Sequence, residues 1–149
     1  MQKKALHRFT KLLIDFMFYS GILVCVFVPV IIFKLIPSTF IAENIRLHFT
    51  VVLMLSGIAA LYILWILRCI FKTLLNTSPF TLKNVDALRK MAVAAFVIST
   101  LYIIKCLFWF TLGTGIIVII FAIAGLFSLV LADVFKQAVQ YKEENDLTV

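Results

Sequence analysis

Four long apolar runs, separated by shorter polar stretches, organise this chain of 149 residues. Each run holds roughly 20 residues, enough at 1.5 Å per residue to cross a hydrocarbon core of about 30 Å. Backbone polar groups in lipid must be satisfied within their own segment, so each run predicts one transmembrane helix. The pattern predicts an all-α, four-pass transmembrane helical bundle in a single domain, residues 1–149, with spans at about 12–35, 49–70, 91–110 and 116–134.

The composition supports the same class. Hydrophobic residues make up 64% of the chain and charged residues 14%, whereas soluble domains are about half apolar. Only the interior of a bilayer tolerates so many outward-facing apolar side chains. Membrane lipid is therefore the expected surroundings of the four helices.

The 14 Lys and Arg residues predict the orientation, because short loops rich in these residues stay on the cytoplasmic side. The N-terminal segment, the stretch 68–90 and the tail 135–149 hold all of them except Lys34, Arg46 and Lys105. We expect a multi-pass protein of the cell membrane with a cytoplasmic N-terminus and a cytoplasmic C-terminus. The basic residues form no single stripe, so direct nucleic-acid binding is not expected.

The predicted cytoplasmic loop, residues 72–90, contains the signals of a helix start. Pro79 ends the preceding helix, Thr81 suits the N-cap, and Asn84 is placed to reach back as in a capping box. Val85 and Leu88 then form an apolar stripe. These signals predict a short cytoplasmic amphipathic helix at 81–90 that leads into the third span.

Residues 78–90, which read SPFTLKNVDALRK, and 142–149, which read KEENDLTV, together resemble the bacterial membrane family called domain of unknown function 2975. The resemblance covers the whole chain and implies four helices. Members are often encoded beside a small helix-turn-helix regulator of the Xre/Cro type, so the resemblance implies a cytoplasmic regulator of that type as a partner. The candidate contact residues are Pro79, Phe80, Thr81, Asn84 and Arg89 in the loop and Glu143, Glu144 and Asp146 in the tail.

The tail itself is predicted to continue the fourth helix out of the membrane. Its acidic end has three interpretations from the residues: it docks a basic surface of a partner, it docks the basic loop of the same molecule, or it is a solvated end. The sequence leaves these open.

Two charged residues lie within or near the predicted spans. Lys105 is a candidate intramembrane site because a charge at the centre of a span costs about 2.5 to 3.5 kcal/mol. It also stands close enough to Phe110 for its long stem to reach the outer head groups. Asp15 lies one turn after Lys11, where an ion pair along the helix is available. The alternative for Asp15 is the carboxylate of a proton-coupled carrier, for which Pro29 would supply a bend.

Small residues spaced four apart predict close packing between helices in lipid. These small residues could pack helices together within one copy of the protein or between two copies, so a homo-oligomer remains an alternative. The small residues are Ser56 and Ala60, Ala95 and Ser99, and Ala124, Ser128 and Ala132.

The sequence contains no recognisable set of residues for chemistry. The three cysteines lie in apolar runs without a CxxC pair, and His7 and His48 fall on opposite sides of the predicted membrane. The glycines form no phosphate-binding motif. We therefore expect no catalytic residue, no metal, no cofactor and no enzyme activity. Two functions remain: a regulatory anchor or sensor for a cytoplasmic partner, and a small transporter or channel subunit. A dry interior would favour the first, and an internal line of polar residues the second.

Overall fold

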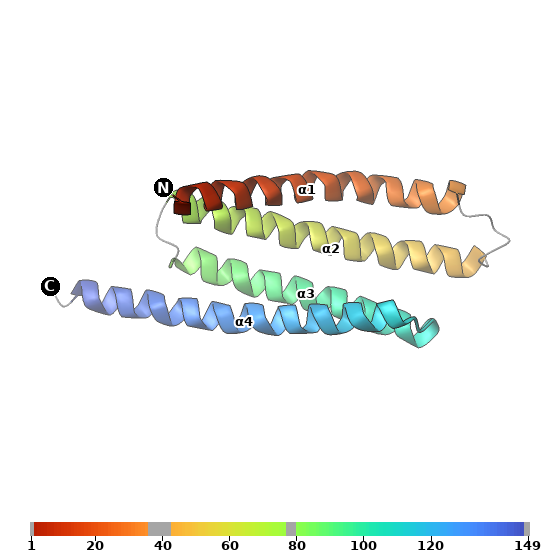
Figure 1. Ribbon diagram of the computed structural model, residues 1–149. Helices are drawn as coiled ribbons and strands as arrows, with labels where there is room; N and C mark the ends of the chain where they lie inside the picture. The colour runs from red at the N-terminus through yellow and green to blue at the C-terminus, as the bar shows by residue number, and fades with distance from the viewer. Residues whose placement is uncertain (1, 36–42, 77–79, 148–149) are drawn as a thin grey trace.

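The computed structural model describes residues 2–35, 43–76 and 80–147, and the surroundings of the side chains at 8–34, 45–73 and 80–145. The described residues form four helices: α1 (Gln2–Leu35), α2 (Glu43–Asn76), α3 (Leu82–Phe108) and α4 (Leu112–Leu147). Successive helices run antiparallel (Figure 1). Each one is long and apolar enough to cross a membrane, which confirms the predicted all-α class with four spanning helices.

The helices end at two recognisable levels, and the rest of the description uses these two ends. The terminal end holds the start of α1, the end of α2, the start of α3 and the end of α4; the distal end holds the opposite four helix ends (Figure 1). At the terminal end α4 projects well beyond the start of α3. The tail thus continues the fourth helix, as predicted.

The connections are shorter than predicted. Helix α2 begins at Glu43 and reaches Asn76, so it extends beyond the predicted span 49–70 at both ends. Together, α2 and α3 make most of the expected loop 72–90 helical. The amphipathic segment predicted at 81–90 is not a separate helix, because α3 continues from Leu82 through it without interruption. Its first turns bury Val85 and Leu88, so the predicted apolar stripe is correct.

The turn between α3 and α4 also lies earlier than predicted. Helix α3 ends at Phe108, so the predicted third span, which runs to residue 110, extends two residues too far. The carbonyl of Thr111 accepts N–H bonds from Thr114 at 2.9 Å and from Gly115 at 3.2 Å. Those two residues therefore already belong to the first turn of α4, and the turn lies at 109–111 instead of in the stretch 111–115 between the predicted spans.

Each helix packs against its neighbours in sequence: α1 on α2, α2 on α3, and α3 on α4. Among the described residues, α1 and α4 make no close backbone contact with each other. The bundle is thus a row that curves without closing. Large apolar side chains remain exposed on the outer faces, as lipid-facing residues would be.

Small residues line the most extensive helix interface, that between α3 and α4. Gly125, Ser128 and Ala132 are buried there, whereas Ala124 is exposed, so the predicted seam through Ala124 was wrong by one position. A Cβ atom added at Gly125 would meet the ring of Phe96 at 2.9 Å. The seam therefore depends on glycine, one residue after the alanine that the four-residue spacing selected.

The hairpin of α1 and α2 has two similar close approaches. A Cβ atom at Gly21 would meet Leu61 at 2.9 Å, and one at Gly57 would meet the Cys25 sulfur at 2.7 Å. These two contacts define the antiparallel register of the hairpin. The same register brings the first turns of the described part of α1 to the last turns of α2.

Candidate functional site

A helix cap, a pair of aromatic rings and a small apolar core organise the terminal end. Thr81 has an extended backbone and its hydroxyl accepts the N–H of Asn84 at 3.4 Å, so it caps α3 as predicted. The ring of Phe80 packs on the ring of Phe135 with centroids 5.2 Å apart. Beneath this contact a small core joins three helices; it consists of Ile66, Ile70, Val85, Leu88 and Ala132.

The structure separates the predicted contact residues into buried and accessible groups. Asn84 is only 2% exposed, so its side chain serves the fold and is closed to a soluble partner. Arg89 lies on the surface with its guanidinium 3.7 Å from the Asp133 carboxylate of α4. Phe80 is 42% exposed and leaves one ring face accessible. Pro79 lies outside the described residues.

The acidic end of α4 lies further out than the start of α3. Glu143 and Glu144 are exposed and are two turns beyond Phe135, which at 1.5 Å per residue is about 12 Å further along the axis. The exposed surface also includes Tyr141 at 71%. Asp146 lies in α4, but its side chain is outside the described set. The accessible residues of the loop group lie at the start of α3 and those of the tail group lie further out on α4, so the two groups form no compact patch.

Asp15 pairs with α2 rather than with its own helix. Its Oδ1 lies 2.6 Å from the Arg68 Nε, so the expected partner, Lys11, was wrong. The Arg68 guanidinium also donates to the Tyr19 hydroxyl at 3.5 Å and lies over the rings of Phe18 and Tyr19. Sequence reasoning counted Arg68 only as a cytoplasmic charge. The register set by Gly57 and Cys25 is the signal that could have paired it with Asp15.

Lys105 points into the helix interface near the distal end. Its amine donates to the Thr114 hydroxyl of α4 at 3.1 Å and lies 4.8 Å from the centre of the Phe49 ring and 5.8 Å from that of Tyr102. Thr114 is buried, and its hydroxyl also lies 3.0 Å from that of Thr111. The ammonium is thus held by neutral groups and aromatic faces from three helices.

Arg46 is a second cation at the distal end that the sequence analysis treated only as a loop charge. Its side chain is 8% exposed, donates to the carbonyl of Phe33 and lies over the ring of that residue. The Thr50 hydroxyl donates to the Arg46 carbonyl at 2.8 Å. The contact of Arg46 with Phe33 joins the start of α2 to the last turns of α1.

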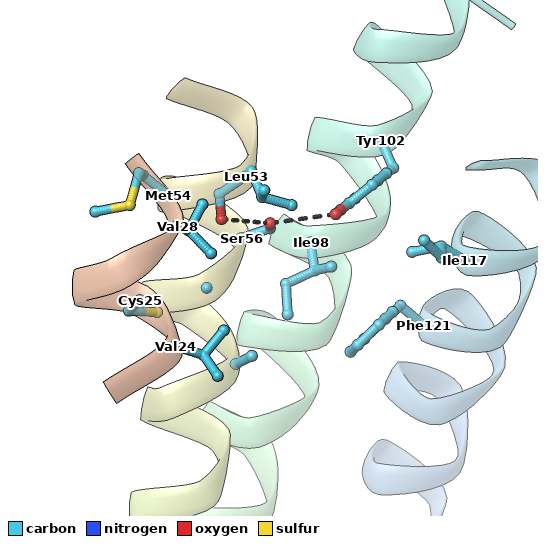
Figure 2. Close-up of a pocket in the computed structure, with 12 residues that line it drawn as sticks. Val24, Cys25, Val28, Leu53, Met54, Ser56, Ile98, Tyr102, Ile117 and Phe121 are labelled. Carbon is cyan, nitrogen blue, oxygen red and sulfur yellow. Dashed lines mark hydrogen bonds between the residues drawn. The ribbon is translucent and has the colours of Figure 1, made fainter. Parts of the chain in front are cut away.

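A cavity of about 250 Å³ lies among the four helices (Figure 2). Its lining is almost wholly apolar and comes from every helix, with Val24 and Val28 on α1 and Ile117 and Phe121 on α4. The polar groups at its edge are the Cys25 thiol and a pair of hydroxyls, those of Ser56 and Tyr102, 3.4 Å apart. Figure 2 shows this pair between α2 and α3, with the Ser56 hydroxyl donating to the Leu53 carbonyl at 3.0 Å.

The described residues offer no cluster of three or more His, Cys, Asp or Glu side chains that could hold a metal ion. The three cysteines, Cys25, Cys69 and Cys106, carry free thiols. The arrangement therefore supports packing, charge pairing and the binding of apolar groups more readily than bond-making chemistry.

Residues 7–149 match the model of a family described as "Protein of unknown function (DUF2975)". No curated protein and no solved structure matches the chain. The match spans all four helices, in agreement with the resemblance carried by the loop and tail motifs.

Proposed function

Because the chain belongs to the DUF2975 family, whose function is unknown, we propose from its own geometry that it is a membrane anchor for a cytoplasmic regulatory protein. In this proposal the four helices cross the cell membrane with both termini in the cytoplasm. The terminal end then faces the cytoplasm and docks the partner.

One observation carries the proposal: α4 is too long for the bilayer alone. Its 36 residues span about 54 Å at 1.5 Å per residue, against a hydrocarbon core of about 30 Å. The projecting part is the polar, exposed stretch that ends in Glu143 and Glu144. A helix that continues rigidly out of the membrane presents its side chains at a fixed height, which suits the docking of a soluble protein.

The charge of this stretch suggests the kind of partner. A DNA-binding regulator carries a basic surface that contacts phosphates, and the acidic end of α4 would complement it. Docking there would occupy the DNA-binding surface, so the regulator would be sequestered at the membrane. A change in helix packing that favours the undocked state would release it. The Xre/Cro-type regulator implied by the family resemblance fits this chemistry.

The interior gives less support to a transporter or channel subunit. A transport path needs polar groups along its length, but the cavity among the four helices is lined by apolar side chains with hydroxyls at one edge. Asp15 lies outside the cavity lining and is engaged by Arg68. A dry interior favours an anchor or sensor over a conduit.

The test is capture of the regulator by the full-length protein in detergent. The test variant carries Glu143→Gln and Glu144→Gln, and the matched control carries Gln137→Ala and Gln140→Ala, which change the same exposed stretch without changing its charge. We expect the wild type and the control to recover a small helix-turn-helix protein whose DNA binding is blocked in the complex. We expect the test variant to recover at least fivefold less. Equal recovery by both variants, or recovery of no such regulator, would contradict the proposal.

A further inference from the structure

The cavity and the Lys105 amine occupy successive layers of the same interior. On three helices, a residue around the amine lies one turn nearer the distal end than a residue that lines the cavity. These pairs are Phe49 and Leu53 on α2, Lys105 and Tyr102 on α3, and Thr114 and Ile117 on α4. The ammonium therefore lies about one turn beyond the lining of the cavity, on its distal side.

The cavity has the size of a segment of a hydrocarbon chain and lies along the helices. Its lining on α2 runs from Leu53 to Ala60, about 10 Å along the helix axis at 1.5 Å per residue. An apolar cavity of about 150 Å³ already suffices to bind benzene, and this one is larger at about 250 Å³. Because it lies along the helices, a chain within it would run parallel to the lipids around the protein.

The cavity is also accessible from the side. Helices α1 and α4 both contribute to its lining, yet they make no close backbone contact with each other among the described residues. Val24, which lines the cavity from α1, is 55% exposed. A chain from the bilayer could therefore enter between α1 and α4 without unpacking any of the three helix interfaces.

The distal end of the cavity is suited to an anion. Lys105 donates to a neutral hydroxyl, and the acidic side chains that the structure describes, Asp15, Asp86, Asp133, Glu143 and Glu144, all lie towards the terminal end. At the distal end α2 begins at Glu43, whose side chain lies outside the described set. A charge held in such surroundings is costly without a counter-charge. Next to it, α4 begins at Leu112, and the N-terminal end of its dipole adds positive potential. Helix α3 ends beside it at Phe108, and the C-terminal end of that dipole is negative. A Cβ atom at Gly113 would meet nothing within 4 Å, so the space there is open.

We propose that the protein binds a single-chain anionic amphiphile of the long-chain carboxylate class. The hydrocarbon chain lies in the cavity among the four helices, and the carboxylate pairs with the Lys105 amine beside the start of α4. One ammonium and one narrow cavity match a single chain with a single charge better than a two-chain lipid with a bulky head group. This site is independent of partner docking at the terminal end, so either proposal can fail alone.

The experiment uses a long-chain fatty acid with a photoreactive diazirine in its chain and the full-length protein in nanodiscs of phosphatidylcholine. Mass spectrometry locates the labelled residues after irradiation. We expect labels on cavity residues of α1 and α4. Labelling should fall at least fivefold with excess unlabelled fatty acid, and should persist with the uncharged alcohol of the same chain length.

Variants separate the head-group contact from the cavity. Lys105→Gln should lower cavity labelling at least fivefold, and Lys105→Arg should retain it. Lys90→Gln, at the other end of the same helix, should leave it unchanged. Val24→Phe places a ring at the edge of the cavity and should also lower labelling, with folding checked by circular dichroism and size-exclusion chromatography.

Three results would overturn the proposal: labels spread over the lipid-facing surface, equal competition by the alcohol, or competition by phosphatidylglycerol as strong as by the fatty acid. The last result would assign the site to a phospholipid. If labelling is unchanged in a folded Lys105→Gln variant, the proposed contact between the carboxylate and the Lys105 amine is wrong.

Discussion

The carboxylate of Asp15 on α1 lies 2.6 Å from the guanidinium of Arg68 on α2. The two residues stand near opposite ends of a hairpin in sequence, and the pair joins its helices close to the terminal end. Both side chains are partly exposed, at 26% and 34%. In the membrane, such a pair contributes to helix association only when both charges are present.

Loss of one partner should therefore destabilise the hairpin. We expect Asp15→Asn to lower the free energy of unfolding by about 1 to 2 kcal/mol, the range of hydrogen bonds to charged groups after allowance for exposure. Lys11→Gln should change it by less than about 0.5 kcal/mol. The measurement is unfolding in mixed detergent micelles, followed by circular dichroism.

A double variant checks that the effect belongs to the pair. Asp15→Asn combined with Arg68→Gln should cost less than the sum of the two single changes, because the second change removes the charge that the first one leaves behind. Strictly additive losses would show that the two residues act separately.

The close approach of Gly57 to Cys25 gives a second prediction. A Cβ atom at Gly57 would lie 2.7 Å from the Cys25 sulfur, so Gly57→Ala should destabilise the α1 and α2 hairpin by about 1 kcal/mol or more. Cys25→Ala removes the sulfur and should restore part of the loss in the double variant. Thermal unfolding in detergent is the measurement.

Gly113→Ala is the matched control, because nothing lies within 4 Å of the added atom. It should leave the midpoint of unfolding within a degree or two of the wild type. If Gly57→Ala is as harmless as this control, the two helices are further apart than described.

The terminal end predicts a contrast between a buried and an exposed polar residue. Asn84 is 2% exposed, so Asn84→Ala should lower the free energy of unfolding by about 1 to 3 kcal/mol. Arg89→Ala should cost less than about 1 kcal/mol, because its ion pair with Asp133 is solvent-exposed. Denaturant titration of the two variants compares them directly, and a larger loss for Arg89→Ala would contradict the assigned burial.

Hydropathy and charge were sufficient to predict four spanning helices, because the length and apolarity of a span are properties of one segment. The rotation of each helix depends on its neighbours and was harder to predict. Ala124 and Gly125 are both one turn from Ser128, and spacing alone selected the exposed one. The partner of Asp15 was missed for the same reason, since the register of the hairpin depends on contacts such as that of Gly57 with Cys25.

In the candidate site, too, local features could be predicted from the sequence, and features that depend on several helices could not. The cap at Thr81 is local, and its signal was visible in the residues that follow it. The cavity and the surroundings of Lys105 were not, because each combines residues from three or four helices. The burial of Arg46 depends on its contact with the last turns of α1, so the residues around Arg46 in the sequence could not predict it.

Cysteine labelling most directly tests the proposed orientation, in which both ends of this four-helix protein lie in the cytoplasm. The background carries Ala at Cys25, Cys69 and Cys106, with a new cysteine at Tyr141 near the end of α4 or at Thr111 between α3 and α4. Both positions are exposed. We predict that a membrane-impermeant maleimide labels Thr111→Cys on intact cells and labels Tyr141→Cys only after the membrane is permeabilised. Labelling of Tyr141→Cys on intact cells would contradict the account.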